Sequence, residues 1–331
     1  MRKNLELRAA ILRQTRAFFA ARGFLEVETP LLVRAPGQEA HLELFRTEFS
    51  GTAPLPCFLI SSPELHMKRL LGSGFERIFQ VCRCFRNNER SPLHNPEFTM
   101  LEWYRAHAGY EEIMEDAEEL VAQVCRQVLG TTRICRQGRA VELAPPWGRL
   151  TVRQAFAACA GIDLDACAGA GEFRRQAPRA CPSLDSRDSW EEIFFKILLE
   201  KVEPALAARG PVFLKDYPAG MAALARLKEE DRRVAERVEA YVAGVELANG
   251  FSELNDPREQ RQRFAAERHK RRERGLPLHP LDEEFLRMME QGMPRAGGMA
   301  LGVDRLVMLL AGASSIDEVL AFPFAEAEER L

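Results

Sequence analysis

The stretch that decides the fold is QVCRCFRNNERSPLHNPEFTMLEWY, residues 80–104. Two runs of strand-forming residues flank its polar centre, so we predict an antiparallel pair of strands over 77–86 and 97–106, joined by a long, partly basic loop. Successive side chains of a strand point to opposite faces. One face of this pair therefore carries Gln80, Cys82, Cys84 and Arg86 from the first strand and Phe98, Met100, Glu102 and Tyr104 from the second. Such a face makes a poor hydrophobic core, so it is either solvated or a polar site.

The rest of the chain alternates between strand-like and helical patterns. Further strands are expected over 23–30, 58–61, 211–217, 239–249 and 297–303. Apolar residues recur at helical spacing in three segments, 5–22, 111–130 and 189–206. These elements favour an α+β fold in which a mainly antiparallel sheet is flanked by helices. We expect a single catalytic domain over 1–331, with residues 131–189 as an elaboration on it.

Composition excludes several classes of protein. The 331 residues carry 46 Lys and Arg against 49 Asp and Glu, and this net charge of -3 argues against a surface that is wholly a nucleic-acid footprint. No apolar stretch is long enough to cross a bilayer, and charges interrupt the N-terminal segment where a signal peptide needs an apolar run, so a cytoplasmic protein is expected. The 8 cysteines include no C-x2-C pair, which favours reduced thiols over disulfides or structural zinc.

Two acidic residues in VELANGFSEL, residues 245–254, are candidates for binding a divalent cation. Glu246 and Glu253 would point to opposite faces of a regular strand, but one extra residue at a bulge near Asn249 and Gly250 restores a common face. Two carboxylates beside arginines suit Mg²⁺ that itself holds polyphosphate. Surface glutamates at this spacing are common, so the pair alone is a weak indication.

The segment GGMALGVDRLVMLLAG, residues 297–312, combines a glycine-rich strand with the start of a helix. Arg305 would lie in the first turn of that helix, where the positive end of the helix dipole favours anions. The alternative is a buried helix with one snorkelling arginine. No glycine-rich loop of the Rossmann or P-loop type follows any predicted strand.

Taken in order, three segments resemble the signature motifs of the class II aminoacyl-tRNA synthetases: GFLEVETP (23–30), FRNN…HNPEFTMLEWY (85–104) and GMALGVDRL (298–306). SSPELHMKRLL (61–71) and ELANGFSEL (246–254) narrow the resemblance to the lysyl branch. The proline of the first motif is already Pro30, so we expect no anticodon-binding OB-fold. The chain therefore resembles most the short elongation factor P (R)-β-lysine ligase family, and RGLPLHPLDEEF (274–285) is similar to that family as well.

The resemblance implies a class II catalytic core and a two-step reaction that uses ATP and Mg²⁺. (R)-β-lysine, or lysine, would be activated as an aminoacyl-adenylate and then transferred to a lysine side chain of elongation factor P. The first motif of this family builds a dimer interface, so a homodimer is expected. tRNA and membranes are not expected as partners.

The resemblance also assigns roles to individual positions. The amino acid would be bound by Ser62, Pro63, Glu64, Glu102, Tyr104, Glu253 and Ala300. ATP would be bound by Arg86, Asn87, Asn88, Asn95, Glu246, Leu247, Gly302 and Arg305, with Arg86 and Arg305 as the catalytic arginines. Mg²⁺ would be held by Glu246 and Glu253. Lysyl-tRNA synthetases usually have glycine where this chain has Ala300, and the resemblance implies that the alanine tunes the pocket toward β-lysine.

One position departs from the family pattern. The family has R-x-E after the phenylalanine of the second motif, whereas this chain reads Arg86-Asn87-Asn88 with Glu89 one place later. Either Asn88 supplies a neutral amide in place of the family's glutamate, or the loop shifts so that Glu89 takes the role of that glutamate.

Other interpretations stay open. A truncated lysyl-tRNA synthetase-like enzyme would have tRNA or a small amine as acceptor, and a catalytically silent paralogue would act as a regulatory subunit. The basic run ERHKRRERG, residues 267–275, is either a solvated helix face or a docking site for an acidic protein partner.

Overall fold

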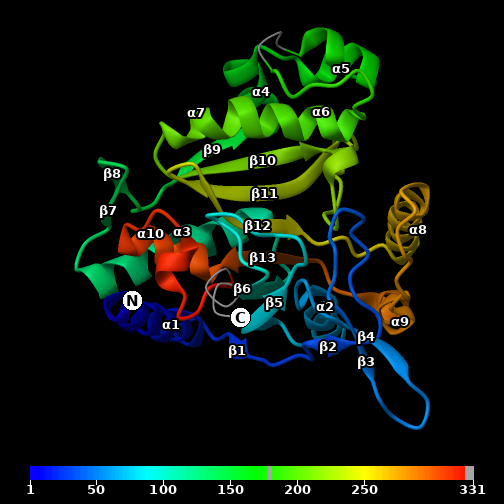
Figure 1. Ribbon diagram of the computed structural model, residues 1–331, viewed down its shortest axis with the longest axis horizontal. Coiled ribbons are helices and arrows are strands. Elements are labelled where there is room, and N and C mark those ends of the chain that lie inside the picture. Colours follow the sequence, from blue (N-terminus) through cyan, green and yellow to red (C-terminus); the bar gives the residue numbers. More distant parts are fainter. Residues whose placement is uncertain (178–180, 325–331) are drawn as a thin grey trace.

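The computed structural model, which describes residues 1–177 and 181–324, is built on an eight-stranded sheet (Figure 1). In spatial order its strands are β1 (Leu25–Glu26), β5 (Arg77–Phe85), β6 (Glu97–Ala106), β13 (Ala296–Gly302), β12 (Val245–Ser252), β11 (Val234–Val242), β10 (Val212–Pro218) and β9 (Gly148–Thr151). Only the outermost pairs, β1 with β5 and β9 with β10, are parallel. The predicted α+β fold with a mainly antiparallel sheet is confirmed.

The predicted antiparallel pair over 77–86 and 97–106 is confirmed as β5 and β6, and its polar face is buried. Gln80 pairs with Glu102 across the two strands, and each is 2% exposed. A second sheet, with β4 (Leu55–Leu59) between β2 (Leu32–Val33) and β3 (Arg46–Phe49), covers part of this face. The face is therefore not a solvated surface.

The opposite face of the sheet is covered by three helices (Figure 1). They are α1 (Arg2–Ala21), α3 (Tyr110–Leu129) and α10 (Val303–Ala311), and the first two match the predicted helices to within a few residues at each end. Phe19 of α1 stacks on Phe79 of β5 with ring centroids 4.7 Å apart. Strand β13 can lie this close to α3 because Gly297 has no side chain; a Cβ there would be 2.5 Å from the carbonyl oxygen of Gly109.

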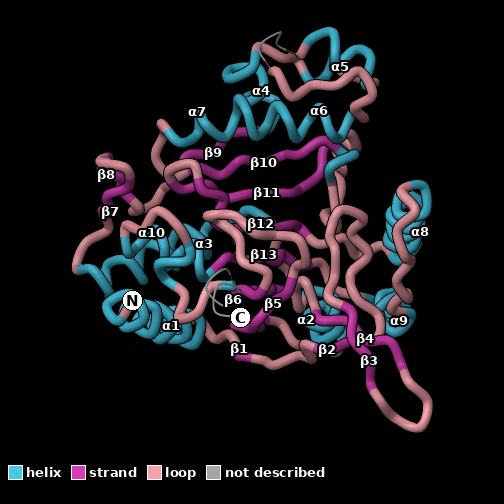
Figure 2. The backbone as a smooth tube through the Cα atoms, in the orientation of Figure 1, coloured by secondary structure: helices cyan, strands magenta, loops and turns pink. Residues whose placement is uncertain are grey.

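A helical lobe lies over β9 and β10 and has a hydrophobic core of its own (Figure 2). Its elements are α4 (Val152–Ala160), a short 3-10 turn (Leu164–Ala166), α5 (Ala170–Gln176), α6 (Trp190–Ile197), a π turn (Leu198–Val202) and α7 (Glu203–Ala207). The predicted helix over 189–206 is thus three consecutive pieces. The predicted elaboration 131–189 supplies the first half of the lobe, and its residues 178–180 lie outside the described part of the chain.

The remaining elements surround the sheet. They are α2 (Glu64–Gly72), β7 (Arg133–Arg136), β8 (Arg139–Glu142), α8 (Pro257–Glu273), α9 (Glu283–Gly292) and 3-10 turns at Ala219–Met221 and Ile316–Val319. Helices α2, α8 and α9 lie on the side of β2–β4–β3 (Figure 1). In the described residues no helix combines the length and the apolarity that a membrane span requires.

The single strand predicted over 239–249 is wrong. The chain turns back at Ala243 and Gly244, whose φ angles are 50° and 78°, so that β11 and β12 form a hairpin. Alanine rarely adopts positive φ, so the sequence contains no typical turn pair at this position.

Candidate active site

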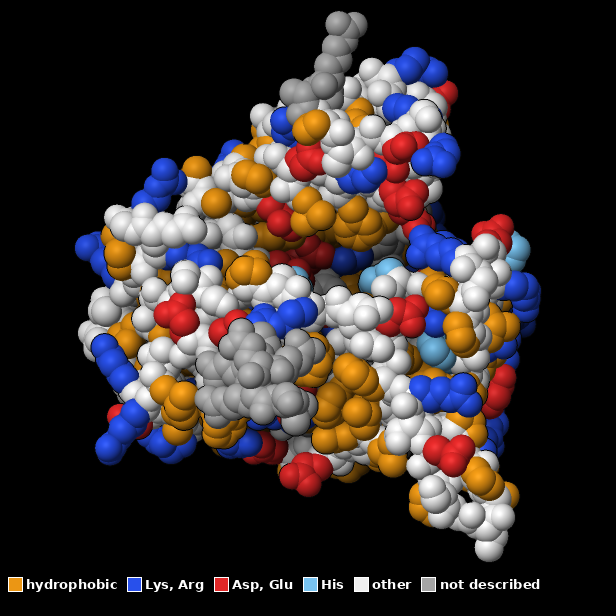
Figure 3. Space-filling model, in the orientation of Figure 1, with side chains coloured by type: hydrophobic (Ala, Val, Ile, Leu, Met, Phe, Trp, Pro, Cys, Tyr) orange, Lys and Arg blue, Asp and Glu red, His pale blue; other side chains and the backbone are white. Residues whose placement is uncertain are grey.

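A row of polar side chains crosses the sheet on the face away from α1 and α3. The register places these residues side by side from β5 to β11: Gln80, Glu102, Ala300, Asn249 and Glu239. The adjacent row contains Tyr104, Gly298, Phe251 and Arg237. The space-filling view shows a hollow below the helical lobe, with acidic side chains inside it and basic side chains at its border (Figure 3).

One end of the site is an ion-paired cluster in which a buried lysine joins two predicted substrate glutamates. The Nζ atom of Lys68 lies 2.6 Å from Oε1 of Glu64 and 2.5 Å from Oε2 of Glu253. Because these two carboxylates surround it, the pKa of Lys68 is raised although burial opposes the charge. Glu64 and Lys68 belong to α2, and Pro63 is the N-cap of this helix. Ser62, just before the N-cap, accepts a hydrogen bond from the amide of Glu64 at 3.2 Å. Sequence reasoning missed Lys68; its position one helical turn after Glu64 was the available indication.

The second part of the cluster is formed by Glu102 and Tyr104. The Tyr104 hydroxyl donates a hydrogen bond of 2.6 Å to Oε1 of Glu102. Burial raises the pKa of Glu102 well above its ordinary value and Glu64 adds to the rise, whereas the hydrogen bond from Tyr104 opposes it. For Glu253, burial raises the pKa and Lys68 opposes the rise.

Three buried oxygens of this region have neither a hydrogen-bond partner nor an ion-pair partner among the described residues. They are Oε2 of Glu102, Oε1 of Glu253 and Oδ1 of Asn249. A buried acceptor without a partner is costly, so such groups usually indicate a missing ligand or water. Acceptors of this kind fit a substrate that carries ammonium groups.

Glycine at position 298 of β13 lets the Tyr104 and Glu253 side chains of this cluster approach the strand closely. A Cβ at Gly298 would lie 2.3 Å from Cε1 of Tyr104 and 2.4 Å from Oε1 of Glu253. Ala300 occupies the next position on the same face, between Glu102 and Asn249. We call this position the floor of the predicted amino-acid pocket.

The other end of the site is basic. Arg86 follows β5 directly; its guanidinium lies over the Phe98 ring at 5.2 Å, and Nη1 is 3.7 Å from Oε2 of Glu89. Asn88 is exposed and has a φ of 64°. The loop therefore places Glu89, rather than Asn88, beside Arg86, which favours the second of the two alternatives for this departure.

Two other predicted nucleotide positions shape the same loop. The amide of Asn87 donates a hydrogen bond of 2.9 Å to the carbonyl of Glu43. The Asn95 side chain donates to the carbonyl of Glu97 at 2.7 Å and accepts from the amide of Phe324 at 3.1 Å. Both asparagines hold the backbone around Arg86 in place.

Arg305 faces the site and is not a snorkelling side chain on a buried helix. Its Nη1 donates to the carbonyl of Glu246 at 2.6 Å, and the same atom is 3.3 Å from Oε2 of that residue. Its Nη2 lies 2.7 Å from Nε2 of His94. Gly302 caps this helix, and the side chain of Leu247 is buried in the core on the other face, so only the Leu247 backbone can reach a ligand.

The structure corrects the predicted magnesium pair, because it does not bring Glu246 and Glu253 together. Tyr241 pairs with Glu246 and Ala240 with Ala248, so a bulge at Leu247 restores the common face, two residues before the predicted position. The two glutamates still lie at opposite ends of β12, roughly 20 Å apart by strand rise. Ligands of one ion must approach it within about 2.1 Å.

Glu239, which sequence reasoning missed, is the carboxylate beside Glu246. Burial raises the pKa of Glu246, the charge of Glu239 raises it further, and Arg305 opposes the rise. Glu239 is itself bound by Nη2 of Arg237 at 2.6 Å and by the Tyr241 hydroxyl at 2.8 Å. Within residues 1–177 and 181–324 no three His, Cys, Asp or Glu side chains form a metal-binding group. A two-carboxylate site fits Mg²⁺, which takes one or two protein carboxylates and completes its shell with phosphates and water.

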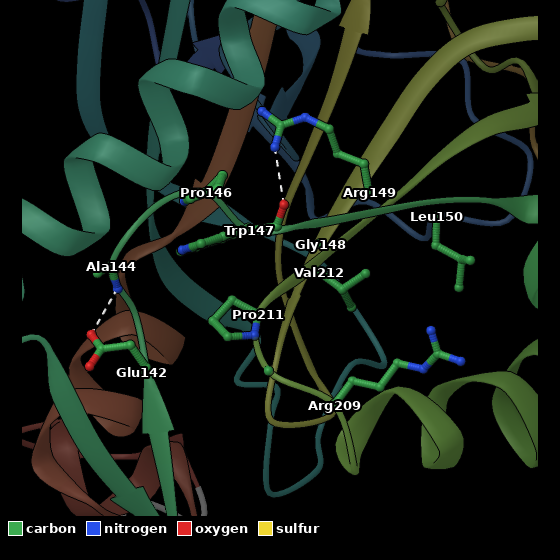
Figure 4. Close-up of a pocket in the computed structure, with 11 residues that line it drawn as sticks. Glu142, Ala144, Pro146, Trp147, Gly148, Arg149, Leu150, Arg209, Pro211 and Val212 are labelled. Atoms are coloured by element: carbon green, nitrogen blue, oxygen red, sulfur yellow. Dashed lines mark hydrogen bonds between the residues drawn. The ribbon is translucent and has the colours of Figure 1, made fainter.

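A separate pocket of about 370 Å³ lies where β9 and β10 begin (Figure 4). Two of its polar side chains are already paired, since Glu142 accepts from the amide of Ala144 at 3.0 Å and Arg149 donates to the carbonyl of Trp147 at 3.1 Å. None of the predicted site residues lines it.

The basic run 267–275 lies mostly in α8, and part of it has a structural role. Arg271 is fully buried and donates to the carbonyls of Pro277 and Leu42 at 2.9 and 3.2 Å. Lys270 forms an ion pair of 2.8 Å with Glu191 of the helical lobe. Docking of an acidic partner on the rest of this run stays a prediction.

Comparison with known proteins agrees with this geometry. The family model for tRNA synthetases class II (D, K and N) matches residues 1–326. A lysine–tRNA ligase from Pelotomaculum thermopropionicum is 41% identical over 331 residues, which cover 99% of this chain and 65% of that relative. The chain thus spans about two thirds of the length of the curated relative. On this match over nearly its whole length, the chain belongs to the class II tRNA synthetase family of the D, K and N type.

Proposed function

We propose that the protein activates (R)-β-lysine, or lysine, with ATP and transfers it to a lysine side chain of elongation factor P. The observation that carries the proposal is the buried cluster of Glu64, Glu102 and Glu253, which leaves two carboxylate oxygens free to accept hydrogen bonds from substrate ammonium groups. The name of the curated relative supports lysine as the kind of amino acid.

In the first step, a carboxylate oxygen of the amino acid attacks the α-phosphorus of ATP. A new P–O bond forms, the bond between the α-phosphorus and the bridging oxygen breaks, and pyrophosphate leaves. Arg86 and Arg305 flank the space between the amino-acid cluster and the helix α10, where their guanidinium groups can hold phosphate oxygens in fixed geometry. Loss of one such preorganised donor typically lowers the rate by ~10²–10³.

Mg²⁺ would be held by Glu239 and Glu246, and when bound it would neutralise phosphate charge. The ion pair of Glu246 with Arg305 would keep the metal-binding carboxylate and the phosphate-binding arginine in register.

In the second step, a neutral acceptor amine attacks the carbonyl carbon of the adenylate. The C–N bond forms, the C–O bond to AMP breaks, and the amine loses a proton. Positioning supplies most of such a rate enhancement, because both reactants are held at one face of the sheet.

Ala300 supports the β-isomer. Its methyl group stands between Glu102 and Asn249 on the pocket floor, where the ammonium groups of the substrate must be placed. An added methyl changes the available depth, and pockets discriminate about 1–3 kcal/mol per methylene-sized difference.

A second candidate function is charging of tRNA with lysine, which the identity to a lysine–tRNA ligase favours. A silent regulatory paralogue is disfavoured by the arrangement of Arg86 and Arg305 with Glu246 at one site.

The deciding experiment is intact-mass analysis of elongation factor P after incubation with the protein, ATP, Mg²⁺ and each lysine isomer. We expect the mass of one β-lysyl group to be added, and a parallel incubation with tRNA to give no charged product. If the folded protein shows no amino-acid-dependent pyrophosphate exchange, the proposed activation step is wrong. Charging of tRNA without modification of elongation factor P would overturn the choice of acceptor.

We also propose a homodimer. Leu25, in the segment that resembles the first family motif, is 51% exposed, and Leu32, two residues after that segment, is 48% exposed. Exposed leucines in this part of the chain support an interface there, and light scattering after gel filtration tests it.

A further inference from the structure

The helical lobe turns one row of side chains toward the candidate active site. On α6 and the π turn that follows, residues 192, 196 and 200 face the segment 181–188, since Lys196 binds Asp188 at 2.7 Å and the carbonyl of Ser183 at 2.6 Å. Beside these residues on the same helix lie Glu191, Phe195, Leu199 and Glu203, which are spaced four residues apart and form a neighbouring row.

The two ends of this row are fixed by contacts with α8 and β11. Glu191 forms an ion pair with Lys270 of α8 at 2.8 Å. At the far end, the Tyr241 hydroxyl lies 3.1 Å from Oε1 of Glu203 and 2.8 Å from Oε2 of Glu239. Because Glu239 belongs to the site, the middle of the row stands at the border of the cleft in which the adenylate would form.

The middle of the row is apolar and exposed. Phe195 is 42% exposed and Leu199 is 57% exposed, while their neighbours Ile193, Phe194, Ile197 and Leu198 are buried in the core of the lobe. In Figure 3, hydrophobic side chains gather along the lower border of the helical lobe, directly above the hollow. Large apolar side chains at the border of a reaction cleft typically mark a contact surface.

The charge of the row favours a protein over a nucleic acid. Its two ionisable members are Glu191 and Glu203, and it carries neither lysine nor arginine. Nucleic-acid surfaces need cations to pair with backbone phosphates. A phosphate backbone on this row would meet carboxylates, whereas the apolar side chains around an acceptor lysine would meet Phe195 and Leu199.

We propose that Phe195 and Leu199 dock the loop of a protein acceptor that carries the lysine to be acylated. The inference rests on the proposed function and names the surface that delivers its acceptor. A lysine side chain is short, so the backbone of the acceptor must come close to the cleft border, where this row lies. The acceptor loop accordingly carries an apolar side chain next to its lysine.

The test separates activation from transfer with the full-length protein. The variants Phe195→Ser and Leu199→Ser are compared with Phe75→Ser, which removes a phenylalanine of similar exposure (40%) beyond the opposite end of β5 from Arg86. Three quantities are measured: lysine-dependent pyrophosphate exchange, the Kd for unmodified elongation factor P, and the rate of its acylation. Melting temperatures establish that the variants are folded.

We expect exchange within twofold of the wild type in all variants. The Kd for elongation factor P should rise about tenfold in Phe195→Ser and Leu199→Ser, with acylation lowered at subsaturating acceptor, and Phe75→Ser should behave as the wild type.

Unchanged binding and transfer, or a parallel loss of exchange, would overturn the proposal. So would a Leu199→Lys variant that improves transfer to tRNA. Wild-type protein without exchange would instead contradict the proposed function, and its Kd would still test the docking surface.

Discussion

At the scale of single residues, Ala300 is the position from which we expect a change of substrate preference. Its side chain lies between Glu102 and Asn249 on the pocket floor. Ala300→Gly deepens the floor by one methyl group, so the ratio of kcat/KM for α-lysine over (R)-β-lysine should rise about tenfold. Pyrophosphate exchange with each isomer measures this ratio. If the folded variant keeps the wild-type ratio of kcat/KM, the pocket floor does not select between the lysine isomers.

Lys68 is the residue on which the stability of the pocket depends. It is fully buried between Glu64 and Glu253, so Lys68→Met leaves two carboxylates without their cation. Breaking a buried pair in this way typically costs about 3–5 kcal/mol, and urea unfolding at neutral pH measures it. The matched control is Arg16→Met, which removes an exposed ion pair with Glu26 and should cost less than about 1 kcal/mol. Adding Glu253→Gln to Lys68→Met should restore part of the loss; a further additive loss would contradict the pairing.

At the scale of elements, β13 connects the predicted amino-acid pocket with the predicted ATP site. A Cβ at Gly298 meets Tyr104 and Glu253, whereas a Cβ at Gly302 meets its nearest atom, Cδ of Arg305, at an ordinary 3.5 Å. We expect Gly298→Ala to raise the KM for the amino acid at least tenfold with little change for ATP. Gly302→Ala should fold normally and act, if at all, on the KM for ATP. Equal effects of Gly298→Ala on both substrates would argue against a separate amino-acid pocket.

Local patterns were enough to predict the pair of strands, β5 and β6, that forms part of the site. The alternation in β5 and β6 gave the correct pairing and the correct face, because both strands and their connection are contiguous in sequence. The hairpin at Ala243 and Gly244 was missed because neither residue forms a recognisable turn pair. Reading 239–249 as one strand hid the fact that Glu239 lies across from Asn249. That error explains why the sequence analysis found no second carboxylate beside Glu246.

Contacts between distant elements could not be predicted in the same way. Lys68 reaches Glu253 from α2, which is far from β12 in sequence, and no periodicity in either segment indicates the pairing. Arg271 looks like part of a solvated basic run, yet it is fully buried because its guanidinium satisfies backbone carbonyls of two loops. Charge reversal at Arg271 would therefore test folding, and the exposed Arg272 is the better position for testing a partner.

At the scale of the whole molecule, the two largest hydrophobic cores of the described residues share the sheet. One lies under α1, α3 and α10, and the other lies in the helical lobe over β9 and β10. Besides Lys270 and Glu191, the contact of Glu203 with Tyr241 joins the lobe to the site. A contact of this kind makes the stability of the junction depend on the ionisation of Glu203.

The last prediction concerns pH and this junction. Burial raises the pKa of Glu203 to about 7, the Tyr241 hydroxyl opposes the rise, and Glu246 and Glu239 add to it. Because the folded state binds this proton more tightly than the unfolded state, its contribution to stability is fully present below about pH 4.5 and is lost as the pH rises through 7. The full change in the free energy of unfolding is at most about 3 kcal/mol, and we expect about half of it after solvent screening of this partly exposed side chain.

Urea unfolding from pH 4 to 8 without Mg²⁺ should show the wild type losing this stability relative to Glu203→Gln. The control Glu230→Gln, at an exposed position outside the junction, should keep the wild-type pH dependence, and a flat difference between wild type and Glu203→Gln would exclude Glu203 as the group that titrates at the junction.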